Sequence, residues 1–249
     1  MTQGFNTIAQ FRSPVGGVLL VDKPQTWTSF DVVKKIRSAL RVKKVGHAGT
    51  LDPMATGLLI LCSSTLTRRI DAFQALDKIY EGSFRLGAVT PSYDAETEIR
   101  DVRPLDGVDE AGIRHAATTF VGAIEQLPPM YSAVKVDGER LYKRARRGEE
   151  IERTPRAVTV THFDILEVKL PEVRFRVECS KGTYVRTLAH DLGQLLGCGA
   201  YLTGLRRTAI GSFLVDEAWS IERISDAART DGLTQERTTE KERADLSGS

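Results

Sequence analysis

Apolar residues recur along the chain in two periods, and these periods predict alternating strands and helices. Short runs of leucine and β-branched residues at 17–24 and 57–64 are typical of buried strands. Between them, residues 28–42 carry apolar side chains at helical spacing, and Thr28 or Ser29 can cap this helix. The positions that predict its buried face are Phe30, Val33, Ile36 and Leu40.

The rest of the chain continues this alternation. The predicted elements are a helix over 65–76, a strand over 79–89, a helix over 109–120, strands over 157–170 and 173–180, an amphipathic helix over 183–197 and a final strand over 208–215. Many neighbouring strands are separated by too few residues for a helical crossover, which a parallel pair requires. The pattern therefore predicts an α+β fold with a mixed, largely antiparallel sheet and flanking helices.

Composition is typical of a cytoplasmic protein. The 249 residues, 41% apolar and 27% charged, suffice for one large or two small globular domains. No apolar run approaches the roughly 18 to 20 residues of a membrane helix, and residues 1–14 lack the features of a secretion signal. The three cysteines are odd in number and far apart, and no two histidines stand at i, i+4 spacing. We therefore expect reduced thiols, no metal site, no membrane association and a cytoplasmic location.

Positive charge is concentrated in two segments. Residues 216–249 contain nine acidic and five basic residues, so the overall net charge of +2 leaves +6 for residues 1–215. Residues 32–46 hold six Lys or Arg and no acid, and residues 128–156 hold eight basic and five acidic residues with two interleaved tyrosines. Basic residues displace counterions from phosphates and aromatic rings stack on unpaired bases, so this pattern favours nucleic-acid binding. A solvated helix face explains the charge equally well at this point.

The glycine-rich segment 46–62, GHAGTLDPMATGLLILC, surrounds one acidic residue, Asp52. An Asp followed by Pro makes a good helix cap or turn, which is one interpretation. The glycines at 46, 49 and 57 would also let the backbone approach a ligand closely, and a nucleophilic carboxylate needs such access. The phosphate-binding pattern G-x-x-x-x-G-K-S/T and the dinucleotide-binding pattern G-x-G-x-x-G are both absent from the sequence, which disfavours nucleotide hydrolysis.

Arg186 stands in the first turn of the amphipathic helix. The helix dipole disfavours a cation there, so this arginine needs an anion nearby. A phosphate or a fixed carboxylate would serve, and a bidentate pair of an arginine with an aspartate would keep a nucleophile ionised and oriented. An exposed surface arginine is the alternative. By default, Tyr80 and Tyr184 are aromatic core residues and His47 is a polar loop residue.

Five motifs in a single order resemble the TruB family of tRNA pseudouridine-55 synthases. They are GVLLVDKPQTWTSFDVV, KKVGHAGTLDPMATGLLILC, IEQLPPMYSAVKVDGERLYKRARRG, ECSKGTYVRTLAHDLG and LRRTAIGSF, and together they cover roughly residues 16–219. The resemblance implies the pseudouridine synthase fold and isomerisation of uridine 55 in the T-loop of tRNA, without metal or organic cofactor. It implies tRNA, through its T-loop and stem, as the partner, and it indicates no protein partner.

The resemblance also assigns roles to residues of this chain. It makes Asp52 the nucleophile, within the G-x-L-D-P pattern. Tyr80, in K-x-Y, would stack on the target base and assist removal of the proton from its C5. Arg186, in KGTYVR, would pair with the Asp52 carboxylate. The positions that match the lining of the uridine pocket are His47, Tyr184 and Leu205.

The resemblance further organises the chain. Residues 1–224 would form the catalytic domain, with residues 128–156 as the insertion that grips the T-loop; its stretch 137–150 suggests a mobile loop or a short surface helix. Residues 225–249 are polar and are expected to form a disordered tail or a frayed helix. Family members commonly carry a C-terminal RNA-binding PUA domain, and only about 30 residues follow Trp219. RNA binding is therefore expected to rest on the catalytic domain and its insertion.

The implied chemistry suits these residue types. The bond between N1 and the ribose C1′ breaks, the base rotates, and C5 joins C1′ while water is kept out. A carboxylate can attack either C6 of the base or C1′ of the sugar, and both routes stay open. A uridine in a folded loop must first be flipped out, at a cost of about a few kcal/mol.

Two other functional classes stay open beside the synthase. One is an RNA-binding folding factor without chemistry, against which the presence of Asp52, Tyr80 and Arg186 argues, because binding alone needs no nucleophile. The other is a guide-dependent or ribosomal-RNA modifying enzyme with the same catalytic core. The insertion that contains PPMYSAVK favours stand-alone tRNA recognition, by resemblance only.

Overall fold

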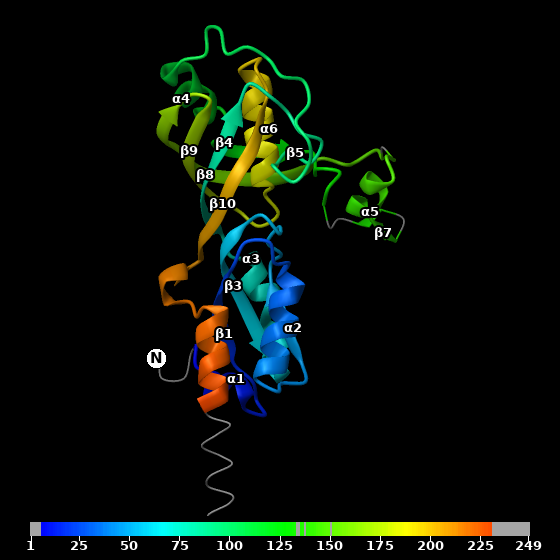
Figure 1. The fold of residues 1–249 in the computed structure, drawn as a ribbon, viewed down its shortest axis with the longest axis vertical. Coiled ribbons are helices and arrows are strands. Elements are labelled where there is room, and N and C mark those ends of the chain that lie inside the picture. The colour runs from blue at the N-terminus through cyan, green and yellow to red at the C-terminus, as the bar shows by residue number, and fades with distance from the viewer. Residues whose placement is uncertain (1–5, 133–134, 137, 150, 231–249) are drawn as a thin grey trace, which may run out of the picture. The chain divides into compact units, whose positions relative to one another are not determined.

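The computed structural model describes residues 6–132, 135–136, 138–149 and 151–230. The chain folds as two compact units (Figure 1). Met1–Gln74 and Phe213–Ser249 form the first unit, and Ala75–Ser212 form the second.

The first unit is a small antiparallel sheet covered by helices. Strand β1 (Val18–Lys23) and strand β2 (Val45–Ala48) both pair antiparallel with β3 (Thr56–Ser63). The remaining elements of this unit are α1 (Ile8–Arg12), α2 (Ser29–Ala39), the 3₁₀ helix η1 (Ser64–Arg69), α3 (Ile70–Ala75), β11 (Phe213–Leu214), the 3₁₀ helix η2 (Val215–Glu217) and a helix over residues 221–230. The core forms where α1, α2 and helix 221–230 bury their apolar residues against β1 and β3.

Helix α2 begins at a complete capping box. The Thr28 hydroxyl accepts a hydrogen bond from Asp31 N, and the Asp31 carboxylate accepts one from Thr28 N, as the sequence pattern allows. The predicted buried face is partly wrong, because Phe30 is 66% exposed while Ser29 and Ile36 are buried. Phe30 precedes Ile36 by six residues, which places it about 120° around the helix from that side chain. Ser29 precedes Ile36 by seven residues and therefore falls on the buried face.

The second unit is a five-stranded antiparallel sheet in the order β10–β4–β9–β8–β5 (Figure 1). The strands are β4 (Lys78–Leu86), β5 (Gly122–Gln126), β8 (Arg156–Lys169), β9 (Glu172–Cys179) and β10 (Ala200–Ile210). Helices α4 (Glu110–Thr118) and α6 (Val185–Leu195) flank it, and β6 (Lys135–Val136), β7 (Glu139–Arg140) and α5 (Leu141–Arg146) form a separate small hairpin and helix. Parallel pairing occurs at isolated bridges such as that between Asp94 and Leu202. The predicted fold class is therefore confirmed.

Two predicted boundaries are wrong. The last long strand was expected over 208–215, but β10 begins at Ala200. Polar, glycine and basic residues at 203–208 interrupt its apolar pattern, so its sequence lacks the alternation of an ordinary strand, and pairing with β4 holds it extended. The helix expected over 65–76 is instead a 3₁₀ turn followed by a short α-helix.

Close packing fixes α6 against β10. A Cβ atom added to Gly193 would lie 2.1 Å from the main-chain nitrogen of Ala200, so only glycine fits this contact. The helix also buries Leu188, Ala189 and Leu192, the apolar stripe that its sequence predicts. This helix holds Arg186 in place, because that residue stands in its first turn.

Helix 221–230 includes the first residues of the segment that was expected to form a polar tail. Ile221 and Ile224 are 4% and 0% exposed, so two apolar anchors suffice to dock a helix of polar composition. Residues 231–249 lie outside the described part of the chain. No helix in the described residues has the length and apolarity that a membrane crossing needs.

Asp191 on α6 gives the stability of the protein a predictable dependence on pH. Burial raises the pKa of its carboxyl from 3.8 to about 6, so the native state holds this proton more tightly than the unfolded state. The stabilisation is present below pH 4 and is lost as the pH rises through 6. We expect Asp191→Asn, relative to wild type, to gain on the order of 1–3 kcal/mol in free energy of unfolding between pH 4 and pH 7. Urea denaturation of both proteins across this pH range measures the difference in their free energies of unfolding.

The matched control is Asp106→Asn, which neutralises an exposed carboxylate in the same unit. Its difference from wild type should stay flat over the same pH range. An equally flat profile for Asp191→Asn would contradict the assigned burial effect.

Candidate active site

The six site residues predicted from the sequence divide between the two units. His47 and Asp52 belong to the first unit, and the second contains Tyr80, Tyr184, Arg186 and Leu205. Tyr80 and Arg186 are buried, and the other four are partly exposed.

Asp52 lies in a tight turn between β2 and β3. Its main-chain carbonyl accepts a hydrogen bond from Ala55 N at 3.1 Å, and no helix follows, so the Asp-Pro pair makes a turn and not a helix cap. The flanking residues Leu51 and Ala55 are 3% and 0% exposed, whereas the Asp52 side chain is partly exposed. The turn is thus anchored in the core on both sides, while its carboxylate stays at the surface of its unit.

Ser29 fixes the backbone on one side of Asp52. Its hydroxyl accepts a hydrogen bond from Leu51 N at 2.9 Å and lies 3.3 Å from Leu51 O, to which it donates. Ser29 is 2% exposed and starts α2, so the helix that Thr28 caps also fixes the position of the turn that carries Asp52. No sequence pattern signals this role, because a serine at a helix start is ordinarily part of the cap.

Lys23 fixes the backbone on the other side. This lysine ends β1 and is 0% exposed. Its ammonium donates hydrogen bonds to three main-chain carbonyls, those of Trp27 at 2.6 Å, Pro24 at 3.0 Å and Pro53 at 3.4 Å. A buried charge is costly unless it is hydrogen-bonded. The three hydrogen bonds therefore fix the positions of both the ammonium group and the carbonyls. Sequence reasoning missed Lys23, because a lysine at the end of an apolar run such as GVLLVDK is ordinarily exposed to solvent.

The glycines around Asp52 serve the backbone more than a ligand. Gly49 and Gly57 have φ values of +89° and +102°, and residues other than glycine adopt such values only at an energetic cost. A Cβ at Gly46 would lie 2.6 Å from the Ile70 side chain, so packing keeps that position bare.

Arg186 is buried and bonded, which excludes the exposed surface arginine. Its guanidinium donates to Ser92 O at 3.0 Å and to Tyr131 O at 2.9 Å, and it lies 3.5 Å from a carboxylate oxygen of Asp94. Arg186 is 4% exposed and Asp94 1% exposed, so this ion pair is shielded from water. The anion that its place in the helix requires is therefore supplied at least in part by Asp94.

The loop that carries Asp94 is locked by its own hydrogen bonds. The Asp94 carboxylate accepts bonds from the Ser92 hydroxyl at 2.5 Å and from Glu96 N at 3.0 Å. The Thr90 hydroxyl donates to Asp94 O at 2.6 Å, and the Ser92 hydroxyl also contacts that of Thr97 at 2.7 Å. A rigid carboxylate holds the guanidinium in one orientation. Sequence reasoning missed Asp94, because it lies 92 positions before its partner in a polar loop without periodicity.

Tyr184 is the N-cap residue of α6, and its backbone is held by Gln126. The Gln126 side-chain oxygen accepts from Tyr184 N at 2.8 Å, and its amide nitrogen donates to Tyr184 O at 3.2 Å. Because Gln126 is 2% exposed, the tyrosine is positioned through its backbone and its ring remains partly exposed.

Tyr80 and Leu205 meet on one face of the second sheet. In the register between β4 and β10, Tyr80 pairs with Arg207 and Gly82 pairs with Leu205. Directly paired residues project to the same face, so Tyr80, Leu205 and Arg207 are neighbours there. The structure thus brings two predicted site residues together and adds a third, Arg207, which is 1% exposed.

A second buried cation accompanies Arg207. Lys78 is 6% exposed, and burial, with the nearby Arg207 guanidinium as a further cause, lowers the pKa of its ammonium to about 8. Two buried cations therefore lie on the face of the sheet that carries Tyr80.

The insertion 128–156 is joined to α6 through Tyr131, whose carbonyl Arg186 contacts. Its residues 133, 134, 137 and 150 lie outside the described part of the chain. Within it, Arg147 pairs with Glu139 at 2.8 Å and with Glu149 at 2.6 Å. The expected short surface helix is present as α5. Part of the basic charge that the sequence shows here is thus neutralised inside the insertion.

Residues that could hold a metal are not gathered in the described part of the chain. No group of three or more His, Cys, Asp or Glu side chains lies close enough together there to bind an ion. The three cysteines are buried free thiols, and burial raises the pKa of Cys62 and Cys179 to about 11.

Family models match nearly the whole of this architecture. The model described as TruB family pseudouridylate synthase (N terminal domain) matches residues 37–185, and the tRNA pseudouridylate synthase B C-terminal domain matches residues 186–240. The chain belongs to the TruB family. The turn of Asp52, the sheet face of Tyr80 and the N-terminal half of α6 with Arg186 all fall within the matched residues.

Two relatives of this TruB-family chain are similar to it in length as well as in sequence. The Opitutus terrae protein named tRNA pseudouridine synthase B is 52% identical over 215 residues, 86% of this chain and 89% of that protein. The Chlorobaculum tepidum protein of the same name is 50% identical over 219 residues, 86% of this chain and 91% of that protein. The predicted family and enzyme class, a tRNA pseudouridine synthase, are confirmed.

Solved structures agree on the fold. A Cbf5–Nop10–Gar1 complex contains a chain with a TM-score of 0.69 and 32% identity, matched over 88% of this chain and 56% of that one. A structure titled as an H/ACA RNP bound to a substrate RNA containing 2′-deoxyuridine gives a TM-score of 0.63 and 29% identity, over 84% of this chain and 52% of the other. This chain thus spans little more than half the length of these two matched chains.

Replacing Lys23 tests its support of the turn that carries Asp52. Lys23→Met keeps the apolar stem but leaves three carbonyls without this donor, so we expect the free energy of unfolding to fall by about 2–4 kcal/mol. We also expect kcat to fall while the variant is still folded, because Pro53 adjoins Asp52. Urea denaturation and single-turnover assays measure the two effects. Arg68→Met, at an exposed arginine of the same unit, is the control, and a Lys23→Met protein as stable as this control would refute the role.

Replacing Arg186 by lysine tests the forked contact. A lysine retains the charge but has one nitrogen, whereas the guanidinium reaches Ser92 O and Asp94 from Nη1 and Tyr131 O from Nη2. We expect Arg186→Lys to lower kcat by about 10²-fold or more, with a smaller effect on tRNA affinity. Arg85→Lys, at an exposed arginine of the same unit, should behave as wild type. Full kcat in Arg186→Lys would show that charge alone suffices.

Proposed function

We propose that this protein converts uridine 55 in the T-loop of tRNA to pseudouridine, with Asp52 as nucleophile and without a cofactor. The observation that supports the chemistry most directly is the setting of Asp52. Its turn is held at Leu51 by Ser29 and at Pro53 by Lys23, while its carboxylate remains partly exposed. A nucleophile must be fixed in position and still reach its substrate, and these contacts meet both needs.

The substrate is supported by the relatives. Proteins about half identical to this chain over 86% of its length carry the name tRNA pseudouridine synthase B. The T-loop and the position of the target uridine within it come from the resemblance of the five motifs, with the insertion 128–156 gripping the loop.

The reaction is an isomerisation in which atoms balance without an added reagent. The bond from N1 to C1′ breaks, C5 bonds to C1′, the hydrogen on C5 is lost and N1 gains a proton. The Asp52 carboxylate attacks C6 of the base or C1′ of the ribose, forms a transient ester or adduct, and leaves again as a carboxylate. Neither route requires a metal or an organic cofactor.

The remaining predicted residues act around this step. Arg186 orients and stabilises the ionised Asp52, and its own rigid partner Asp94 keeps the guanidinium from turning away. Tyr80 stacks on the base and assists removal of the C5 proton. Flipping the uridine out of its base stack costs about a few kcal/mol. Contacts of the protein with the flipped base and with the RNA phosphates must offset this cost. The residues that line the pocket are His47, Tyr184 and Leu205.

A guide-dependent or ribosomal-RNA modifying activity is the alternative. One solved relative is titled as Cbf5 in complex with two other proteins, and its identity to this chain is 32%. The proteins at 50% and 52% identity carry the tRNA name, so the stand-alone tRNA activity is favoured. Incubating the isolated chain with an unmodified tRNA transcript and mapping pseudouridine distinguishes the two, because a guide-dependent enzyme would leave the transcript unchanged.

Asp52→Asn is the direct test of the nucleophile. The amide keeps the size of the side chain but attacks poorly, so we expect pseudouridine formation to fall by roughly 10⁴-fold or more, with tRNA affinity within several-fold of wild type. Single-turnover assays on the transcript and filter binding measure the two quantities. Asp71→Asn, at an exposed carboxylate of the same unit, should retain full activity. Turnover at a wild-type rate in Asp52→Asn would remove Asp52 from this role.

A further inference from the structure

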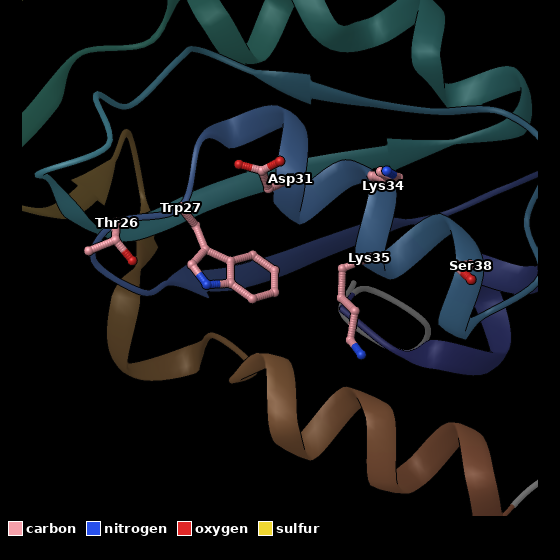
Figure 2. A pocket seen from close by; sticks show the side chains of 6 residues that line it. All are labelled: Thr26, Trp27, Asp31, Lys34, Lys35 and Ser38. Atoms are coloured by element: carbon pink, nitrogen blue, oxygen red, sulfur yellow. The ribbon is translucent and has the colours of Figure 1, made fainter.

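A groove of about 570 Å³ runs beside α2 in the first unit. Its lining consists of Thr26, Trp27, Asp31, Lys34, Lys35 and Ser38. Figure 2 shows that Trp27 and Lys35 extend to the same side of α2, the side that helix 221–230 faces. Trp27 packs partly against the core and keeps part of its ring exposed. The groove therefore combines an aromatic surface with two ammonium groups.

The groove adjoins the turn of Asp52. Thr26, at one end of it, donates its main-chain N–H to Pro53 O at 2.8 Å. The carbonyl of Trp27 accepts from the buried Lys23 that also contacts Pro53. A chain-like ligand that lies in the groove would thus pass directly to the residues that carry the nucleophile.

The cations along α2 and the segment after it make no direct pair with a carboxylate in the described part of the chain, although the Asp31 carboxylate attracts Lys34 through space. They are Lys34, Lys35, Arg37, Arg41, Lys43 and Lys44, and all six are exposed. None of their side chains forms a hydrogen bond or ion pair with a residue that the structure describes. Residues 32–46 contain no acid that could neutralise them.

Exposed cations of the second unit behave differently. The paired ones include Arg85 with Glu172, Arg114 with Glu110, Arg147 with Glu139 and Glu149, Arg174 and Lys169 with Glu167, and Arg176 with Asp164. A solvated surface ordinarily intersperses both signs in this way. Arg100, Arg156 and Lys181 are exposed cations of the second unit without such a pair in the described residues, but they stand apart from one another in the sequence. The segment 32–46 differs in its density, with six cations and no acid.

Asp31 is the one acid in the lining, and its charge is already engaged. Its carboxylate accepts hydrogen bonds from the Thr28 hydroxyl at 2.6 Å and from Thr28 N at 2.9 Å. These contacts lower the pKa of its carboxyl and direct its charge to the positive end of α2. Figure 2 shows it pointing away from Trp27 and Lys35. It does not close the groove to an anion.

We propose that this groove binds a stretch of the RNA substrate outside the everted nucleotide, with backbone phosphates at Lys34 and Lys35 and an unpaired base or ribose against Trp27. Lysine ammonium groups serve phosphates as point charges, and an indole face accepts any base by stacking. An acidic protein segment would satisfy the lysines but gains nothing specific from the indole. This inference rests on the proposed function, because it takes the RNA substrate as the ligand.

The test uses the full chain and a fluorescein-labelled, unmodified tRNA transcript at several salt concentrations. The variants are Lys34→Gln with Lys35→Gln, and Trp27→Leu with Trp27→Phe. The control removes two exposed charges from paired residues, Arg85→Gln with Lys169→Gln. The free transcript and poly-glutamate serve as competitors. Pseudouridine formation on the same transcript is followed in parallel.

The double lysine variant should weaken binding by about 5- to 30-fold at low salt and reduce the slope of log K against log salt by about 1 to 2. The control pair should leave both values and the basal activity close to wild type. Trp27→Leu should weaken binding by about 5- to 50-fold with the salt slope unchanged, and Trp27→Phe should recover most of that loss. Thermal unfolding of each variant separates lost binding from lost packing, because Trp27 also contacts the core.

Equal affinity and slope in the double lysine variant and the control pair would overturn the inference. Competition by poly-glutamate that disappears in the double lysine variant, with unchanged tRNA binding, would overturn it in favour of an acidic protein segment. A wild-type protein that binds the transcript but forms no pseudouridine would refute the proposed function, while the affinities would still decide the groove. The two failures are therefore distinguishable.

Discussion

Buried cations that donate hydrogen bonds to main-chain carbonyls constrain the backbone near the candidate residues of each unit. Lys23 is fully buried and bonds three carbonyls, one of them beside Asp52. Arg186 is nearly buried and bonds the carbonyls of Ser92 and Tyr131. A buried ammonium or guanidinium tolerates few arrangements, because each lost hydrogen bond leaves a charge unsolvated. Loops that contribute such carbonyls are therefore held in one conformation, although they contain no regular secondary structure.

Each of these cations adjoins a residue with a proposed chemical role. Lys23 and Ser29 together fix the backbone at both sides of Asp52. The turn that carries the carboxylate is therefore held in one conformation. Arg186 is steadied by Asp94, whose loop has its own internal hydrogen bonds. Pre-organised groups lose little free energy when the substrate arrives, which is the advantage that an enzyme gains from building a site on rigid supports. The ring of Tyr80 lies on a sheet face beside Leu205 and a buried Arg207, and is positioned by strand register.

Exposed cations are paired with carboxylates to different extents in different parts of the molecule. In the second unit, several exposed cations are matched with carboxylates across strands or within the insertion, although Arg100, Arg156 and Lys181 are not among the pairs in the described residues. Along α2 and the residues after it, cations stand exposed without such partners in the described chain. Paired surface charges contribute little to either stability or binding, whereas unpaired ones keep their full attraction for phosphate. The distribution of carboxylates, more than that of lysines and arginines, thus distinguishes a binding surface from a solvated one.

The sequence by itself determined the fold class, most elements, the family and the six candidate residues. Local spacing and capping suffice for α2, β3 and α6, because such signals act within one turn or one strand. The predictions that Phe30 is buried and that the last long strand begins at residue 208 were wrong. The buried side and the extent of an element depend on what packs against it. Only the tertiary structure showed Lys23, Ser29, Asp94 and Gln126 in their supporting positions. A hydrogen bond from a side chain to a distant carbonyl leaves no periodic trace in the sequence, because any residue can supply the carbonyl.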